Sequence, residues 1–411
     1  MTSINYENII KKHIFVLTIL FLLIPGFASA AEFGFVINQN VDITNEDEDI
    51  VYEYSALIVP RLYFLFGDTA SLFVSAGVTL ESSQQGFTYI PELLRTELSL
   101  QWLRFGVQLG RFGYAAPLSF LADGLFDGVL FTHSSGAGQF RIGGFYTGFL
   151  HKKSAGIEMT EYDRAVNGVP LDYDNFTNTY FAPPRAIASL EWEHLAVADF
   201  MRLNISAVAQ FDFTDVIDSE KYDSQYLTAK IGLPAGSLFF ELGGVVSTFQ
   251  AATFQDDDSD LQMSYAGSAG VNLTFPTTFN SRLSFNARYA SGGFIPITTS
   301  YAGDIFKAKL SALSVFDLTY TARFTEKFGI NLSGKYFVRT DADTFNTFPI
   351  TEEGDGGDLM GAEFFGRMSW SPVSDIQFSL GAGAFMPSFG DNWPDAKPVW
   401  KITLAAVIAV F

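Results

Sequence analysis

The chain has 411 residues, of which 48% are hydrophobic, and 45 acidic residues against 25 basic ones give it a formal net charge of −20. A nucleic-acid-binding protein needs a basic surface, so this charge excludes that class. The chain has no cysteine, which excludes disulfides, lipid anchors on cysteine and thiolate metal sites.

The amino terminus has the pattern of a secretory signal. Lys11 and Lys12 precede an apolar run over 14–24, and Ala28-Ser29-Ala30 forms an A-x-A cleavage site. The run is shorter than the roughly 20 residues that a membrane-spanning helix needs. We therefore predict a signal peptide over 1–30 and a mature chain over 31–411 with a net charge near −21, since the signal carries two lysines and one glutamate. A retained transmembrane helix is the alternative.

The mature chain alternates between apolar and polar residues with a period of two. In 327–339, for example, Phe328, Ile330 and Leu332 alternate with polar residues such as Asn331. Successive side chains of a strand point to opposite faces, so this period predicts strands. A helical period of 3.6 residues would scatter the apolar positions around the helix axis and does not fit. The predicted strands are 32–40, 51–66, 70–82, 90–102, 104–112, 125–134, 138–150, 184–196, 199–213, 222–233, 236–250, 260–275, 279–292, 306–324, 326–340, 359–371, 374–386 and 397–411.

The connections between these strands alternate between long polar loops and turns of a few residues. Every long loop follows an odd-numbered strand; the longest are 151–183 and 341–358. This asymmetry is typical of a closed barrel in a bacterial outer membrane. We predict an all-β fold, a transmembrane antiparallel up-and-down β-barrel of about 18 strands, with 16 as the alternative. Its turns face the periplasm and its long loops face outside.

Aromatic residues favour a membrane barrel over a soluble β-sandwich, which shows the same alternation. Trp102, Trp192 and Trp370 all fall on the apolar face at the predicted periplasmic ends of strands. Such a row is an interfacial girdle, and its other predicted members are Phe105, Phe275, Phe279, Phe324 and Phe328. Gly, Ser, Thr and Asn on the polar face suit a water-filled lumen.

The signal, the strand rhythm and the terminal Phe411 resemble a bacterial outer-membrane porin, although the last strand lacks the usual aromatic residue two positions before its end. Residues 98–145, with Gly110-Arg111-Phe112 and Asp123-Gly124, are similar to part of the alginate-export and phosphate-selective porin families. The resemblance implies insertion by the barrel-assembly machinery and contact with outer-membrane lipid and lipopolysaccharide. It implies neither cofactor nor catalysis.

Few residues suggest other chemistry. His133 lies beside Ser134 and Ser135 but has no evident carboxylate partner, so a structural or solvated histidine is the preferred interpretation over a hydrolase site. Three acidic runs, 46–49, 256–260 and 352–358, lie in predicted outside loops. Oxygen ligands there suit a divalent ion, but none has the spacing of a dedicated calcium loop.

Fifteen basic residues fall on the polar strand face, although the chain is acidic. Arg288, Lys309 and Lys335 are predicted to reach similar heights on three consecutive strands, with Lys307 and Arg339 above them. Arg95 lies on the same face of an earlier strand. Because neighbouring strands lie about 5 Å apart, these residues predict a positive arc that selects ions. The alternative is ion pairing that stiffens the wall, with Asp317, Glu363, Glu241 and Asp375 as partners.

Loop 113–124 is too apolar to face solvent. Its apolar residues and its final acidic residue are predicted to form a constriction inside the barrel: Tyr114, Pro117, Leu118, Phe120, Leu121 and Asp123. Packing against a neighbouring protomer in a homo-oligomer is the alternative. Loop 293–305 shares the task in this interpretation, while the polar loop 151–183 stays outside and caps the mouth.

Together these features predict a passive channel for small polar solutes that favours anions or acidic saccharides. A carrier for hydrophobic compounds and a surface adhesin are the alternatives.

Overall fold

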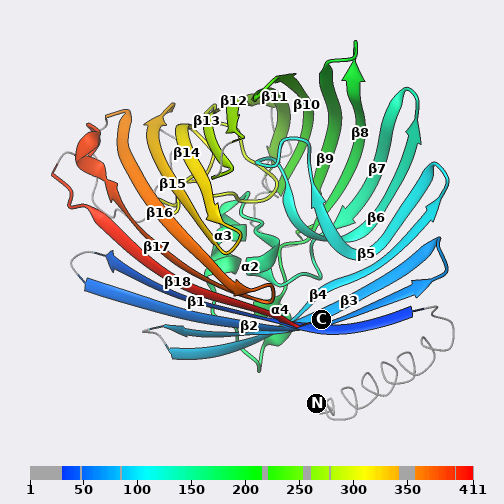
Figure 1. Ribbon diagram of the computed structural model, residues 1–411, viewed down its shortest axis with the longest axis horizontal. Helices are drawn as coiled ribbons and strands as arrows, with labels where there is room; N and C mark the ends of the chain where they lie inside the picture. The colour runs from blue at the N-terminus through cyan, green and yellow to red at the C-terminus, as the bar shows by residue number, and fades with distance from the viewer. Residues whose placement is uncertain are drawn as a thin grey trace.

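A computed structural model describes residues 30–46, 49–83, 86–214, 221–252, 261–276, 279–341, 357–393 and 395–410. These residues form one 18-stranded antiparallel sheet in which each strand pairs with its neighbours in sequence, and the first strand pairs with the last. The sheet is therefore a closed up-and-down barrel, as predicted, and 16 strands are excluded. Three short helices lie within the ring of strands (Figure 1).

The strands are β1 (Ala30–Glu46), β2 (Asp49–Phe66), β3 (Ala70–Ser83), β4 (Gly86–Trp102), β5 (Phe105–Ala115), β6 (Asp123–Ser135), β7 (Gly138–Tyr146), β8 (Arg185–Val197), β9 (Met201–Asp212), β10 (Lys221–Ala235), β11 (Leu238–Ala252), β12 (Gln262–Phe275), β13 (Ser281–Ala290), β14 (Leu313–Thr325), β15 (Phe328–Arg339), β16 (Leu359–Val373), β17 (Ile376–Met386) and β18 (Val399–Val410). The helices are α2 (Lys152–Ala155), α3 (Glu161–Gly168), α4 (Phe176–Tyr180) and the 3-10 turn η2 (Pro387–Phe389). Among the described residues, no helix has the length and apolar character needed to cross a membrane.

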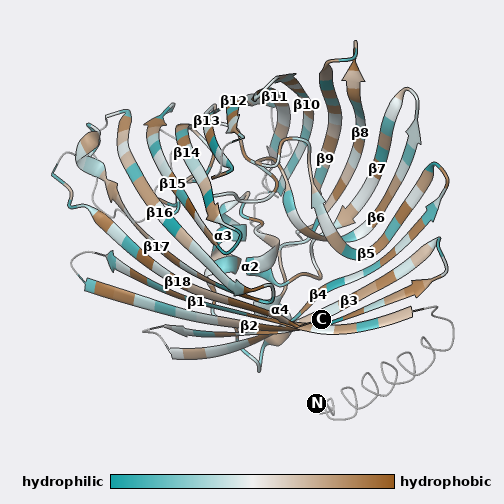
Figure 2. Cartoon of the chain, viewed as in Figure 1, coloured by the Kyte–Doolittle hydropathy of each residue, from teal (hydrophilic) through white to brown (hydrophobic). Residues whose placement is uncertain are grey.

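The two faces of the wall differ as the alternation predicts. Leu332 is 50% exposed on the outer face, whereas the neighbouring Asn331 faces the lumen and donates through its side-chain amide to Thr321 Oγ1 at 3.0 Å. Apolar and polar residues alternate along most strands (Figure 2). A barrel in lipid needs such a wall, because every backbone polar group is satisfied between strands and apolar side chains cover the outside.

One edge of the barrel carries the short turns, and we call it the turn end; the other is the loop end. Aromatic rings of the outer face follow one another along the turn end, with centroid distances of 5.3 Å for Phe279 and Phe324, 6.0 Å for Phe324 and Phe328, and 5.8 Å for Trp370 and Phe378. The predicted girdle is present at these positions.

The last strand, whose register the sequence left open, pairs along its length with β1, from Phe35 opposite Val410 to Thr44 opposite Lys401. Lys401 thereby faces the lumen, where its ammonium lies 2.8 Å from the Asp42 carboxylate. The register of β18 is thus fixed by a polar pair on the inner face. Residues 1–29 of the predicted signal over 1–30, residue Phe411 and most of the three acidic runs lie outside the described residues.

One predicted strand was wrong over its first half. The prediction placed a strand at 306–324, but β14 begins only at Leu313. Phe306, Ala308, Leu310 and Ala312 are all fully buried, so the segment before β14 does have a buried residue at every second position. It is an extended loop packed inside the barrel, and its period of two arises from that packing and not from pairing in the wall.

Candidate functional site

Three loops from the loop end fold into the lumen and join there; we call them together the plug. They are the segments 116–122, 147–184 and 291–312. The Leu121 carbonyl accepts hydrogen bonds from the backbone N–H groups of Ile297, at 2.8 Å, and Thr298. The Gly156 carbonyl accepts from the Thr299 N–H at 2.7 Å. The plug is therefore one connected body, with fully buried residues from each loop at its centre.

The first loop, over 116–122, packs inside the lumen. Tyr114, Leu118, Phe120 and Leu121 are buried, Pro117 is half-buried and Asp123 is exposed. Leu118 reaches β11, because a Cβ atom at Gly243 would lie only 2.4 Å from Leu118 Cδ2. Strands β5 and β11 lie far apart in the strand order, so this loop crosses the lumen. The loop therefore lies inside the barrel, and its role as a constriction remains a proposal.

The second loop contradicts the prediction that it stays outside. A buried arginine on the wall holds this loop. The Arg185 guanidinium on β8 binds the Asp163 carboxylate of α3 at 2.7 Å and also pairs with Asp212 on β9, and both carboxylates are buried. Asp163 further accepts from the backbone N–H groups of Met159 and Thr160 at 2.9 Å. The loop is polar in composition, yet its charges find partners on the wall, so it folds inward.

The third loop is held by a carboxylate on the wall. Glu363 of β16 is fully buried and accepts from the backbone N–H groups of Asp304, Ile305 and Phe306 at 2.8–2.9 Å. Three such donors satisfy a buried carboxylate that would otherwise be costly in an apolar environment. The loop that contains Asp304 is therefore fastened to the wall.

Two residues of the predicted arc, Lys335 and Lys309, form ion pairs with carboxylates of the plug. Lys335 Nζ lies 2.6 Å from Asp304 and 3.7 Å from Glu363, and Lys309 Nζ lies 2.6 Å from Glu158. Lys307 and Lys309 precede β14, so they do not stand on a strand as predicted, and Lys307 is exposed. The ion-pairing alternative describes Lys335 and Lys309 better than a free arc does.

The other predicted selectivity residues lie in different surroundings. Arg339 Nε is 3.9 Å from Asp358, and Arg95 donates to Glu97 at 2.6 Å. Arg288 on β13 is opposite Ser268 of β12, close to the tip of the constriction loop, and forms no ion pair with a described residue. Arg288, Lys335, Arg339 and Arg95 lie on strands as predicted, but of these four only Arg288 has no ion pair with a described residue.

Below the plug, toward the turn end, the arginines that face the lumen without a carboxylate partner among the described residues include these four: Arg202, Arg282, Arg323 and Arg367. All four are exposed. The register aligns Arg282 with Thr321, Asn331 and Arg367 in one row across β13 to β16, and Arg323 lies two residues below Thr321. We call Arg282, Arg323 and Arg367 the lower arc.

The lower arc is oriented by neutral groups. Arg282 Nε donates to Asn272 Oδ1 at 3.1 Å and to Ser284 Oγ at 3.0 Å, while the Arg367 guanidinium lies 5.7 Å from the centre of the Phe365 ring. These contacts position the cations without neutralising them. The sequence placed all three on the polar face, but it showed no signal that separates them from the arginines and lysines that bind loops.

The closed barrel fold has counterparts among solved structures. OccK2 (OpdF) of Pseudomonas aeruginosa is similar with a TM-score of 0.61 and 10% identity, over 93% of this chain and 98% of that one. OpdO of the same organism has a TM-score of 0.58 and 12% identity, over 93% and 98%, and OccK2 in complex with glucuronate has 0.59 and 9%, over 93% and 99%. At such identities the likeness shows a shared fold. No family model and no curated protein sequence matches the chain.

Two histidines of the described chain pack against aromatic rings. The His133 ring stacks on Phe105, with a centroid distance of 4.6 Å, at the turn end of the wall, and His151 packs in the plug against Tyr180 at 4.9 Å. In the described part of the chain, no His, Asp and Glu side chains form a group of three that would hold a metal ion.

Proposed function

We propose that the chain is a bacterial outer-membrane porin, a passive channel for small polar solutes that favours anions, acidic saccharides among them. The 18-stranded closed barrel with an apolar outer face supports the membrane location, and the solved porins that share the fold support the class. One of these holds glucuronate, an acidic saccharide. On this proposal the turn end faces the periplasm and the loop end faces outside.

The lower arc carries the proposed preference. Arg282, Arg323 and Arg367 present unneutralised guanidinium groups on adjacent or near-adjacent strands, which is how charged rings and arcs of a pore select ions. A guanidinium group binds a carboxylate with two parallel hydrogen bonds. An anion that passes the plug therefore meets cations whose charge nothing on the wall cancels.

Export and insertion complete the proposal. The signal over 1–30 directs the chain to the periplasm, the barrel-assembly machinery inserts it, and lipid and lipopolysaccharide surround the outer wall. Mass spectrometry of the mature protein from the outer-membrane fraction is expected to find Ala31 as its first residue. The local likeness to alginate-export and phosphate-selective porins stays a prediction.

The alternatives receive less support. A carrier for hydrophobic compounds needs an apolar passage, but apolar lumen residues such as Phe294 and Ile297 are fully buried within the plug. An adhesin displays its longest loops, but α2, α3 and α4 lie inside the barrel (Figure 1). In planar bilayers we accordingly expect steady ion conductance, which neither alternative predicts.

The decisive experiment compares two triple variants under a salt gradient. We expect R282Q/R323Q/R367Q to lower the chloride-to-potassium permeability ratio, with the largest effect at low salt because screening is then weakest. The matched triple R288Q/K309Q/K335Q also removes three positive charges, but two of them are already paired with carboxylates, so its ratio should change less. A parent-like reversal potential for the first triple variant would refute selection by the lower arc. A larger shift in the second triple variant would instead assign selectivity to the predicted arc of Arg288, Lys309 and Lys335.

A further inference from the structure

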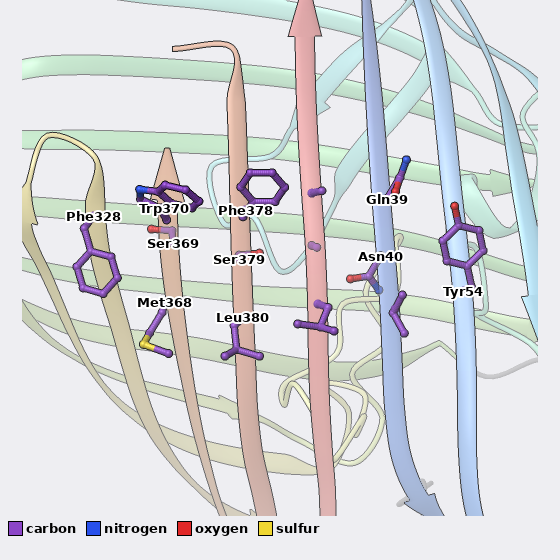
Figure 3. Close-up of a pocket in the computed structure, with 14 residues that line it drawn as sticks. Gln39, Asn40, Tyr54, Phe328, Met368, Ser369, Trp370, Phe378, Ser379 and Leu380 are labelled. Carbon is purple, nitrogen blue, oxygen red and sulfur yellow. The ribbon is translucent and has the colours of Figure 1, made fainter. Parts of the chain in front are cut away.

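A groove of about 380 Å³ lies on the outer wall, away from the lumen. It crosses β15, β16, β17, β18, β1 and β2, and its apolar side chains include Phe328, Met368, Trp370, Phe378, Leu380 and Leu404 (Figure 3). The register pairs Phe328 with Trp370, Trp370 with Phe378, and Phe378 with Ala406. The small side chain of Ala406 leaves the floor low between the larger residues.

The groove rises from the turn end into the apolar band. Phe328 is the first residue of β15, whereas Gln39, which pairs with Ala406, lies in the middle of β1. A row of paired residues runs across tilted strands, so it climbs the wall of a barrel. On the proposed outer-membrane location, hydrocarbon surrounds this surface, and the girdle residues Trp370 and Phe378 mark where it meets the periplasmic interface.

Trp370 supplies a polar group at the lower end of the groove. Its side chain is 50% exposed, and its indole N–H has no hydrogen-bond partner among the described residues. The indole of Trp192, by contrast, donates to the Ala137 carbonyl at 2.8 Å. Interfacial tryptophans place the ring in hydrocarbon and the N–H toward polar groups of lipid. Trp370 is therefore a free donor at the interface.

We propose that the groove binds one acyl chain of a glycerophospholipid from the periplasmic leaflet, and that an ester or phosphate oxygen of that lipid accepts from the Trp370 indole. The proposal rests on the outer-membrane location proposed above. A second outer-wall groove of about 350 Å³, whose apolar lining includes Ile231, Leu233, Phe240, Leu242, Val271 and Phe285, contains no tryptophan. It provides an internal comparison, because it offers a chain-shaped surface without the donor.

Native mass spectrometry of the purified mature chain, incubated with palmitoyl-oleoyl phosphatidylethanolamine, tests the proposal. We expect Ala406→Phe, which fills the groove, to lower retention of the lipid about tenfold, the loss expected when about two methylene groups leave an apolar site. Trp370→Phe keeps an aromatic ring but removes the donor, and should lower retention about fivefold, as for one neutral hydrogen bond. Ala269→Phe fills the second groove and should leave this retention unchanged.

Several results would overturn the inference. Parent-like retention in Ala406→Phe would place the lipid elsewhere, and equal losses in Ala406→Phe and Ala269→Phe would show non-selective coating of the wall. Oleic acid retained as well as the phospholipid would remove the role of Trp370. A dimer that Ala406→Phe dissociates would assign the groove to a second copy of the chain. Failure of the porin proposal appears separately, as absence from the outer-membrane fraction, and heat-modifiable gel mobility checks that each variant folds.

Discussion

The loop-end half and the turn-end half of the lumen use the same residue types for different purposes. In the loop-end half, Arg185, Lys309 and Lys335 each bind a carboxylate of the plug or of the wall beside it. In the turn-end half, Arg323 and Arg367 are exposed and unpaired among the described residues. The basic residues that bind the plug thus fasten loops, whereas the arginines of the lower arc remain available to solutes.

This difference has a physical basis in burial. A charge withdrawn from water needs a partner, and once paired its field is largely cancelled. The plug withdraws the loop-end charges from water, so these charges serve structure. Nothing folds over the lower arc in the described chain, so its charges stay hydrated and act on ions. Variants that remove charges from either half should therefore separate stability from selectivity.

The largest expected effect comes from Asp163→Ala. The change leaves Arg185 buried with one carboxylate partner fewer, and breaking a buried ion pair costs about 3–5 kcal/mol. We expect undocking of 147–184, a higher single-channel conductance and new protease cleavage in that loop. Glu161→Ala is the matched control: Glu161 lies two residues away, and its side chain is 91% exposed although it pairs with Arg164. Unchanged conductance in Asp163→Ala would contradict the anchoring role.

The barrel could be predicted from sequence because it depends on local regularities. Alternation of apolar and polar residues identified 18 strands, and the alternation of long and short connections gave their direction. The aromatic girdle followed from the same face assignment. The apolar loop that contains Leu118 and Phe120 was also interpretable, since an apolar loop needs burial wherever it lies.

The plug could not be predicted to the same extent, because it depends on contacts between distant residues. Asp163 lies within the polar loop 151–183 and Arg185 lies on the strand that follows it. Composition alone indicated that this loop stays outside. Lys309 was wrongly predicted to lie on a strand, because the extended loop that contains it has a buried residue at every second position, as a strand does. Which cations remain unpaired is decided by where the carboxylates of the loops dock, so the lower arc emerged only from the structure.

The next effect is acid sensitivity of the plug through His151. Burial lowers the pKa of His151 from 6.5 to about 4, and the nearby Lys153 and Lys152 act in the same direction while Glu81 opposes them. The undocked loop therefore takes up a proton as the pH falls through 6.5, whereas the docked loop does so only near its folded pKa. The contribution of neutral His151 to the free energy of docking is complete above pH 6.5, and about 2 kcal/mol of this contribution is lost at pH 5.

Conductance recorded at pH 7 and pH 5 measures this loss. The parent should open further at pH 5, and His151→Phe, which keeps a ring beside Tyr180, should not. His133→Phe is the control, because His133 lies on the wall and not in the plug. An acid response that persists in His151→Phe would assign it to another group.

The smallest effects are expected from two single variants, Lys335→Gln and Arg367→Gln, which compare the loop-end and turn-end halves of the lumen most directly. Lys335 is partnered by Asp304 at 2.6 Å and by Glu363 at 3.7 Å, and Glu363 keeps its three backbone donors without it. Lys335→Gln should therefore weaken docking of the third loop by only about 1 kcal/mol, because the Asp304 side chain is 37% exposed and its carboxylate stays in contact with water. The permeability ratio should stay near that of the parent. Arg367→Gln should do the reverse, because the Arg367 guanidinium touches the Phe365 ring and no carboxylate. Its removal should lower the chloride-to-potassium ratio at low salt without exposing any loop to protease.

If both variants shifted the ratio equally, paired and unpaired cations would act alike on permeating ions, and the division of the lumen into a structural half and a selective half would fail.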